Sequence, residues 1–256
     1  MVSTVKTEIG RFVWHEQISA DPEAAQRFYT ELLGWEIETW KSGEGIPDYP
    51  MIKAHDTTHG GFRTAEGGAP PNWNGSVFVE DVDDTVLRAE GAGGAVMFGP
   101  VDIPEIGRVA VVADPQGGVT APFRPAGDPP SSSGVFLWDE LMTDDVEGAK
   151  HFYTEVFGWT TEDMDMGEMG TYTLLKRGSD PDAGGILQKP PGALGGALWI
   201  PYLAAEDVDA SAAKAKELGG TAIMEPYDVP TVGRMAVMVD PTGASFGLFR
   251  ASEETR

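Results

Sequence analysis

A long internal repeat constrains the fold of this chain more than any other feature of its 256 residues. The segment from Phe12 to Ile18 recurs 124 positions later, from Phe136 to Met142, with a tryptophan and a glutamate at the same places. The same spacing relates Phe28-Tyr29-Thr30-Glu31 to Phe152-Tyr153-Thr154-Glu155, and Gly34-Trp35 to Gly158-Trp159. A repeat of this length predicts two halves that form the same structure.

The repeat continues to the end of each half with a spacing of 126 positions. It relates Glu80-Asp81-Val82-Asp83 to Glu206-Asp207-Val208-Asp209, Pro100–Arg108 to Pro226–Arg234, and Asp114-Pro115-Gln116-Gly117 to Asp240-Pro241-Thr242-Gly243. Between the copies, residues 125–134 are rich in proline, glycine and serine, which is typical of linkers. We therefore expect an N-terminal domain over residues 1–127 and a C-terminal domain over residues 128–256, with a linker at about 125–134.

Helix and strand signals alternate within each half. Asp21-Pro22-Glu23 is typical of a helix start, and Gly34 of a helix end, with apolar residues at helical spacing between them. Residues 145–158 repeat this helix, and residues 81–91 and 207–219 predict a second helix in each half. Strand-forming residues are concentrated in residues 75–79, 108–113, 198–203 and 235–239. The pattern predicts an α+β fold.

The charge balance excludes several classes of partner. The chain has 41 acidic and 18 basic residues and a formal net charge of −23, so its field repels nucleic acid and anionic membrane surfaces. It contains no cysteine, which excludes disulfides and thiolate chemistry. We found no signal-peptide pattern and no apolar run long enough to span a membrane, and we expect a cytoplasmic protein.

Common catalytic motifs are also absent from the sequence. There is no glycine-rich dinucleotide loop, no phosphate-binding loop and no serine-hydrolase elbow, and only four histidines are present to act as a base. A nucleotide-dependent enzyme or a serine hydrolase is therefore disfavoured.

The order of these segments and motifs resembles the vicinal-oxygen-chelate superfamily of glyoxalases, bleomycin-resistance proteins and dioxygenases. The chain is similar to tandem actinobacterial members of the glyoxalase-like or hydroxylase-like type, and the resemblance covers nearly all of it. It implies tandem glyoxalase-like α+β domains, each made of two βαβββ modules that form a curved half-barrel sheet around a cavity.

The resemblance also implies where a metal would bind. Enzymes of this family hold one divalent cation, such as Mn, Fe, Ni or Zn, with histidine and glutamate side chains. The corresponding positions here are occupied by Trp14, Asn74, Ala121, Trp138, Ile200 and Gly247. None is a ligand of the expected kind, so we expect no metal site and no cofactor.

A displaced metal site is the alternative. His15, His55 and His59 lie near Asp56 in the sequence and would suit a divalent cation. Their counterparts in the second copy are Asp139, Ser179 and Ala183, which do not form such a set. We therefore favour histidines that face solvent on an edge strand and a loop.

The repeated strand places a carboxylate among large apolar residues. Strand alternation predicts Phe12, Trp14, Glu16 and Ile18 on one face, and Phe136, Trp138, Glu140 and Met142 on the equivalent face of the second copy. If this face lines the cavity, Glu16 and Glu140 are candidate catalytic acid/base residues, because burial disfavours a charged carboxylate. The alternative is a structural role in which each glutamate accepts hydrogen bonds from the protein.

Aromatic and basic residues are the candidates for ligand binding. Trp14 and Trp138 offer flat surfaces for stacking on an aromatic ligand, and Trp73 and Trp199 begin the second module of each half. Arg108 and Arg234 lie in stiff proline-containing loops with Asp102 and Asp228. Each arginine either braces its loop or binds an anionic group of the ligand.

These observations favour a metal-independent small-molecule binding protein, with an apolar or aromatic ligand in a cavity between facing modules. The alternative is a glyoxalase-like lyase, isomerase or hydroxylase that uses Glu16 or Glu140 as acid/base, with or without a displaced divalent metal. A third class is an interaction protein whose cavities are vestigial. The sequence leaves open whether the chain is an enzyme and is compatible with a homodimer.

Overall fold

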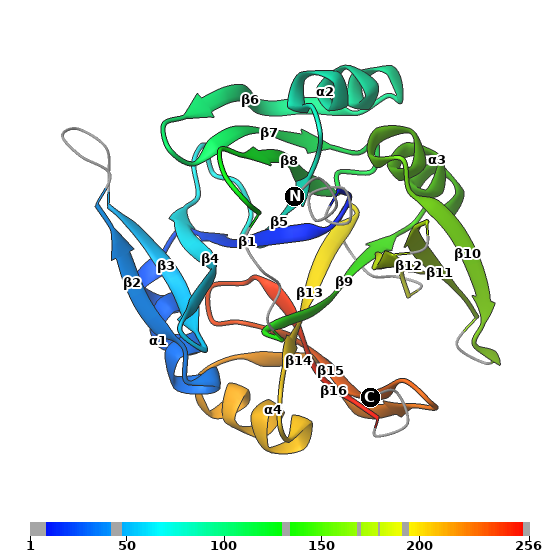
Figure 1. Ribbon diagram of the computed structural model, residues 1–256. Coiled ribbons are helices and arrows are strands. Elements are labelled where there is room, and N and C mark those ends of the chain that lie inside the picture. Colours follow the sequence, from blue (N-terminus) through cyan, green and yellow to red (C-terminus); the bar gives the residue numbers. More distant parts are fainter. Residues whose placement is uncertain are drawn as a thin grey trace. The chain divides into compact units, whose positions relative to one another are not determined.

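The computed structural model describes residues 9–41, 48–129, 134–167, 170–178, 180–190 and 195–252. Each half of the chain contains two βαβββ modules (Figure 1). The N-terminal half comprises β1 (Phe12–Ser19), α1 (Pro22–Leu33), β2 (Glu36–Trp40), β3 (Tyr49–Ala54), β4 (Thr57–Thr64), β5 (Asn72–Phe78), α2 (Val82–Gly91), β6 (Ala95–Ile103), β7 (Gly107–Ala113) and β8 (Val119–Pro125).

The C-terminal half repeats this order of elements. It comprises β9 (Phe136–Thr143), α3 (Val146–Phe157), β10 (Thr160–Asp165), β11 (Thr171–Arg177), β12 (Asp180–Gln188), β13 (Leu198–Ala204), α4 (Val208–Glu217), β14 (Thr221–Val229), β15 (Gly233–Val239) and β16 (Ser245–Ala251). The linker expected at about 125–134 begins at the end of β8, and its residues 130–133 lie outside the described part of the chain.

Each half forms one eight-stranded mixed sheet, which agrees with the two βαβββ modules that the family resemblance implies. The strand order is β2-β3-β4-β1-β5-β8-β7-β6 in one sheet and β10-β11-β12-β9-β13-β16-β15-β14 in the other. β1 pairs in parallel with β4, and β9 pairs in parallel with β12, while the outer strands pair antiparallel. The repeated strand that carries the tryptophan and the glutamate is therefore a central strand in both sheets.

The compact units of the structure do not coincide with the halves of the sequence. The first unit comprises residues 1–14, 75–130 and 138–199, and the second comprises residues 15–74, 131–137 and 200–256. α2 packs against α3 in the first unit, and α1 packs against α4 in the second (Figure 1). Each hydrophobic core thus combines one module from each half of the chain.

The helices α1, α2, α3 and α4 begin after the predicted aspartate caps, and α1 and α3 end at the predicted glycines, whereas α4 ends at Glu217, before the predicted Gly219. Asp21 caps α1 by accepting a hydrogen bond from the Ala24 backbone N–H at 2.9 Å, and Asp145 caps α3 in the same way. Gly34 ends α1 with a positive φ of 71°, a conformation that glycine adopts without strain. Capping satisfies backbone N–H groups that have no partner within the helix.

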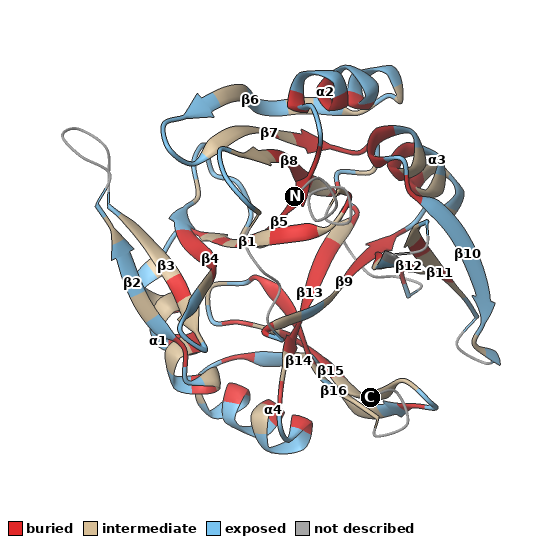
Figure 2. Ribbon diagram, viewed as in Figure 1, coloured by how far each residue is buried: buried red, intermediate tan, exposed pale blue. Residues whose placement is uncertain are grey.

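Aromatic side chains dominate both cores. Phe152, Tyr153, Trp159 and Trp199 are buried in the first unit, and Phe28, Tyr29, Trp35, Trp73 and Phe246 are buried in the second. The edge strands β2, β6 and β10 are largely exposed (Figure 2). No helix among the described residues is long and apolar enough to cross a membrane.

Strict alternation fails at the start of the repeated strand. Phe12 packs against Trp199 in the core of the first unit, whereas His15 stacks on Phe136 in the second unit, with ring centroids 4.0 Å apart. Phe12 and Phe136 thus pack on the cores, whereas Trp14 and Trp138 are half-buried. From Trp14 onward, half-buried and buried residues of β1 do alternate as predicted.

Candidate functional site

A carboxylate and a phenol meet on the N-terminal sheet. Glu16 on β1 lies directly opposite Gly61 on β4, and Tyr49 from β3 extends its ring over that glycine. The Tyr49 hydroxyl donates a hydrogen bond to Glu16 Oε1 at 2.8 Å. A Cβ atom at position 61 would lie 2.3 Å from the Tyr49 hydroxyl oxygen, so glycine is required for this contact.

An arginine lies beside the same carboxylate. Arg63 on β4 is the register partner of Ile18 on β1, two residues beyond the glutamate. Its guanidinium Nη1 is 3.5 Å from Glu16 Oε2, and the Arg63 and Glu16 side chains are 44% and 18% exposed. Trp14, Glu16 and Ile18 are all half-buried, which leaves this face of the strand accessible to a solute.

The C-terminal sheet repeats this arrangement with changes. Tyr172 from β11 extends over Gly185 on β12, which lies opposite Glu140 on β9. The Trp138 indole N–H donates to the Tyr172 hydroxyl at 2.7 Å. Glu140 is buried, with 6% exposure, and Leu187 occupies the position equivalent to Arg63.

Two buried polar networks brace the cores. In the first unit, Tyr153 donates to Asp114 Oδ2 at 2.9 Å and accepts from the Trp199 indole N–H at 2.8 Å. The other oxygen of Asp114 accepts from the backbone N–H groups of Gln116 and Gly118. This network explains the repeated Asp-Pro-x-Gly turn, because the turn presents backbone donors to its own aspartate.

The second unit contains the equivalent network. Tyr29 donates to Asp240 Oδ2 at 3.0 Å and accepts from Trp73 at 3.0 Å, and Gln17 donates to the same carboxylate oxygen at 3.1 Å. Burial raises the pKa of Tyr29 and Tyr153 well above 10, and the neighbouring aspartates raise it further. Both phenols therefore remain protonated donors.

Trp73 and Trp199, which we predicted to bind ligand, are part of these two networks. Trp73 and Trp199 are 2% and 3% exposed, and their only polar atoms donate to the core tyrosines. We expected them to line a cavity, but the structure places both in the hydrophobic cores. A tryptophan that begins a buried strand packs into the core when a neighbouring helix presents a hydroxyl to its N–H.

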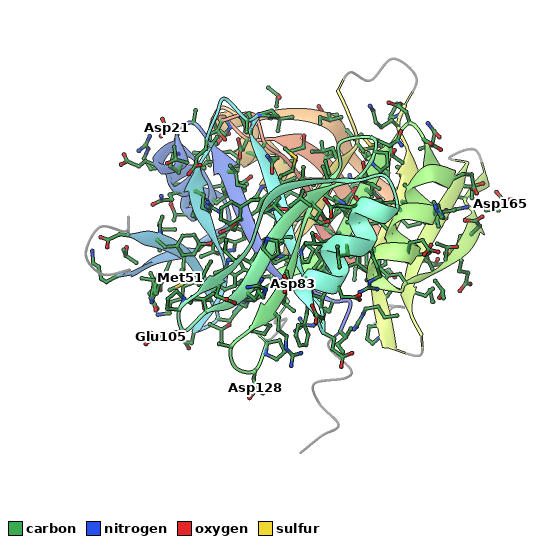
Figure 3. The ribbon with its side chains drawn as sticks, turned by 90° about the horizontal axis from the view of Figure 1, so that it is seen from above. Asp21, Met51, Asp83, Glu105, Asp128 and Asp165 are labelled. Carbon is green, nitrogen blue, oxygen red and sulfur yellow. The ribbon has the colours of Figure 1, made fainter. Side chains whose placement is uncertain are left out.

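Arg108 and Arg234 are engaged in equivalent ion pairs. Arg108 donates through Nε and Nη2 to Asp83 at 2.6 and 2.8 Å, and through Nη1 to Asp102 at 2.9 Å. Hydrogen bonding to Arg108 holds the pKa of Asp83, labelled in Figure 3, below its usual range. Arg234 pairs with Asp209 and Asp228 in the second half. The expectation that these pairs lie in loops is wrong, because each arginine is the cross-strand partner of its aspartate in a β-hairpin. The geometry fits a bracing role, since each arginine joins its hairpin to the first turn of a helix.

The positions at which the family resemblance implies a metal do not supply a suitable donor set. Ala121 and Ile200 have no ligating atom, and the Trp138 N–H is already a donor to Tyr172. At Gly247, a Cβ atom would lie 2.2 Å from the Tyr202 ring, so no side chain fits there. Among the described residues, no group of three or more histidine, aspartate or glutamate side chains is placed to hold a cation.

The histidines differ from the expectation. His15 and His59 are 4% and 5% exposed, so the prediction that they face solvent is wrong, while His55 is exposed at the turn between β3 and β4. His59 Nε2 lies 3.0 Å from the Ala54 carbonyl oxygen, which can only accept. For His15, the prediction failed because β1 is not an edge strand but lies between β4 and β5 in the sheet. His59 is on β4, which lies between β3 and β1.

Sequence reasoning identified Glu16, Glu140, Trp14 and Trp138 but missed their neighbours. Tyr49, Arg63 and Tyr172 were not singled out, although they contact or adjoin the candidate residues. A signal was present, because Gly60-Gly61 recurs as Gly184-Gly185 with a tyrosine 12 or 13 positions earlier. A glycine opposite a glutamate on neighbouring strands leaves room for an aromatic side chain.

Comparison with protein families agrees with this architecture. A model described as "Glyoxalase-like domain" matches residues 15–120, and one described as "Bleomycin resistance protein-like N-terminal" matches residues 136–172. The chain is 35% identical over 250 residues to "Putative glyoxylase CFP32" of Mycobacterium tuberculosis, covering 94% of this chain and 95% of that protein. It is 31% identical to "Anthracycline biosynthesis protein DnrV" of Streptomyces peucetius, with 95% and 94% covered.

Solved structures share the fold. The Mn(II)-bound glyoxalase from Novosphingobium aromaticivorans superposes with a TM-score of 0.66 at 18% identity, covering 94% of this chain and 82% of that one. The 2,3-dioxygenase LapB from Pseudomonas sp. KL28 superposes with a TM-score of 0.64 at 14% identity, covering 96% and 94%.

Proposed function

We propose that this chain, which belongs to the glyoxalase and bleomycin-resistance (vicinal-oxygen-chelate) superfamily, is a metal-independent small-molecule binding protein that takes an apolar or aromatic ligand. One observation carries the proposal. The strand position from which family members present a metal ligand holds Trp14 in one half and Trp138 in the other, both half-buried and each two residues before a glutamate. A flat apolar surface replaces a ligating atom at the same place in both halves.

The chemistry of this face favours a ring-shaped ligand. Indole rings bind aromatic and conjugated molecules through stacking and burial of apolar area. The nearby carboxylate and phenol hydroxyl fix the orientation of a polar substituent. This combination of a mostly apolar wall and a few polar groups is typical of small-molecule sites.

A relative supports the ligand class. The Streptomyces peucetius protein is named for anthracycline biosynthesis, and anthracyclines are flat, conjugated ring systems. The identity of 31% extends over almost the whole of both chains, so the two share the same tandem arrangement.

Metal analysis combined with ligand binding tests the proposal. Purified full-length protein is expected to contain less than stoichiometric Mn, Fe, Ni and Zn, and to bind planar aromatic compounds equally well before and after treatment with a chelator. Trp14→Ala and Trp138→Ala are each expected to weaken binding about fivefold, because each stacking surface contributes on the order of 1 kcal/mol. Phe98→Ala, which removes an exposed aromatic side chain from the outer strand β6, serves as the control. Stoichiometric metal that is required for binding would refute metal independence.

A second candidate function is acid/base catalysis by the same glutamates. The observation that favours it is the 2.8 Å hydrogen bond between the Tyr49 hydroxyl and Glu16, which places a proton donor and a carboxylate side by side on an accessible face. If the chain is an isomerase or lyase, Glu16→Gln or Glu140→Gln is expected to lower turnover at least a hundredfold while binding persists. Full activity in both variants would exclude this role.

A further inference from the structure

The two copies of the carboxylate site differ in charge at the position two residues beyond the central glycine. Both sheets have a glutamate opposite a glycine, and a tyrosine extended over that glycine. The residue two positions beyond the glycine is Arg63 in the N-terminal sheet and Leu187 in the C-terminal sheet. An arginine and a leucine at equivalent positions beside the same carboxylate predict different ligand preferences.

The Arg63 guanidinium has capacity for another partner. Its one ion pair among the described residues is with Glu16, at a separation of 3.5 Å that exceeds hydrogen-bonding distance, and its side chain is 44% exposed. A guanidinium has five N–H donors arranged as a fork that fits a carboxylate with two parallel hydrogen bonds.

Two other arginines in this chain, Arg108 and Arg234, each form ion pairs with two carboxylates. Arg108 bridges two carboxylates, Asp83 and Asp102, and Arg234 bridges Asp209 and Asp228 in the same manner. Within the described part of the chain, Arg63 has one carboxylate neighbour where these have two. Among the same residues, no second carboxylate pairs with its guanidinium, and its side chain is 44% exposed.

We propose that Arg63 selects the ligand of the N-terminal half by binding its acidic oxygen group, and that the ligand is a small aromatic carboxylic acid. The proposal rests on the proposed function and specifies its substrate class. The ligand carboxylate takes the second position on the guanidinium, as Asp102 does on Arg108. The C-terminal half, with Leu187 at this position, takes neutral aromatic molecules.

The Glu16 carboxylate does not prevent a ligand carboxylate from binding Arg63. One of its oxygens accepts the Tyr49 hydrogen bond, and the other faces Arg63, so its charge is already stabilised by the protein. Trp40 is half-buried and is the cross-strand partner of Tyr49, whereas Met164 is the partner of Tyr172 in the other half. The N-terminal site therefore offers an extra aromatic surface next to its cation.

The test compares two probes of nearly equal shape, 2-naphthoate and 2-naphthamide. Each is titrated into the full chain in a calorimeter at about 0.15 M salt, which screens the long-range repulsion between the negatively charged protein and the anionic probe. Wild-type protein is expected to bind the acid about tenfold more tightly than the amide at one site, as a charge-assisted hydrogen bond predicts. Arg63→Leu should remove that preference and leave amide binding unchanged, and Arg63→Lys should retain part of it.

The reciprocal variant keeps the proposal falsifiable. Leu187→Arg should create a second site that prefers the acid, and unchanged unfolding midpoints would show that both variants fold. Equal binding of acid and amide, unaffected by Arg63→Leu, would overturn the role of Arg63 while leaving the proposed function intact. Failure of the wild-type protein to bind either probe would overturn both.

Discussion

Tyr153 and Tyr29 each join a buried aspartate to a buried indole through the hydroxyl group. In Tyr153→Phe, Asp114 loses a donor and the Trp199 N–H loses its acceptor. We expect a loss of about 1–3 kcal/mol in the free energy of unfolding, measured by urea denaturation, because water cannot reach either group. Tyr49→Phe is the control and should cost less, since its hydroxyl lies on an accessible face.

His59 makes the stability of the protein depend on pH. Burial lowers the pKa of His59 from 6.5, so the unfolded chain binds a proton more readily than the folded one. The contribution of His59 to stability is fully present above pH 6.5 and is lost as the pH falls through the lower pKa of the folded state. We expect His59→Gln to reduce the loss of stability between pH 7 and pH 5, measured by urea denaturation. His151→Gln, at an exposed position of α3, is the matched histidine substitution for comparison.

At the residue scale, sequence alone identified the repeated tryptophans and glutamates but not all of their roles. Trp14 and Trp73 are the same residue type on neighbouring strands, yet one is half-buried on an accessible face and the other is in the core. The difference depends on which face of each strand meets a helix. That information lies in contacts between residues far apart in the sequence.

At the scale of the element, the aspartate caps determine where the first helix of each half begins. Asp145 accepts a hydrogen bond from the Gly148 backbone N–H at 2.9 Å. Asp145→Ala should lower the free energy of unfolding by about 1 kcal/mol, detected by thermal denaturation, because one helical N–H loses its partner. Glu155→Ala, an exposed substitution in the same helix, should have little effect. Equal effects of the two substitutions would argue against a capping role.

Helices were easier to predict than strand environments for a physical reason. Caps and helical periodicity are local, since they involve residues within a turn of one another. The environment of a strand residue depends on its neighbours in the sheet, which come from distant parts of the chain. Phe12 illustrates this, because it belongs to a core built with Trp159 and Trp199 from the other half.

At the scale of the whole molecule, the two halves of the sequence depend on each other. The Asp240 carboxylate of the C-terminal half binds Tyr29 and Gln17 of the N-terminal half, and Asp114 binds Tyr153 in the reciprocal way. We expect fragments 1–127 and 128–256 to lack cooperative unfolding as isolated monomers and to regain it when mixed, as followed by circular dichroism. Cooperative unfolding of an isolated, monomeric fragment would show that its core does not need the other half.

The sequence by itself determined the duplication, the order of the modules, the starts of the helices and the strands that carry Trp14 and Trp138, because repeats, caps and apolar patterns are properties of consecutive residues. Only the tertiary structure decided that each core is shared between the halves and that Trp73 and Trp199 are core residues. It also decided that Tyr49 and Arg63 lie beside Glu16. Those outcomes depend on strand register and on packing between distant segments, which a single sequence does not specify.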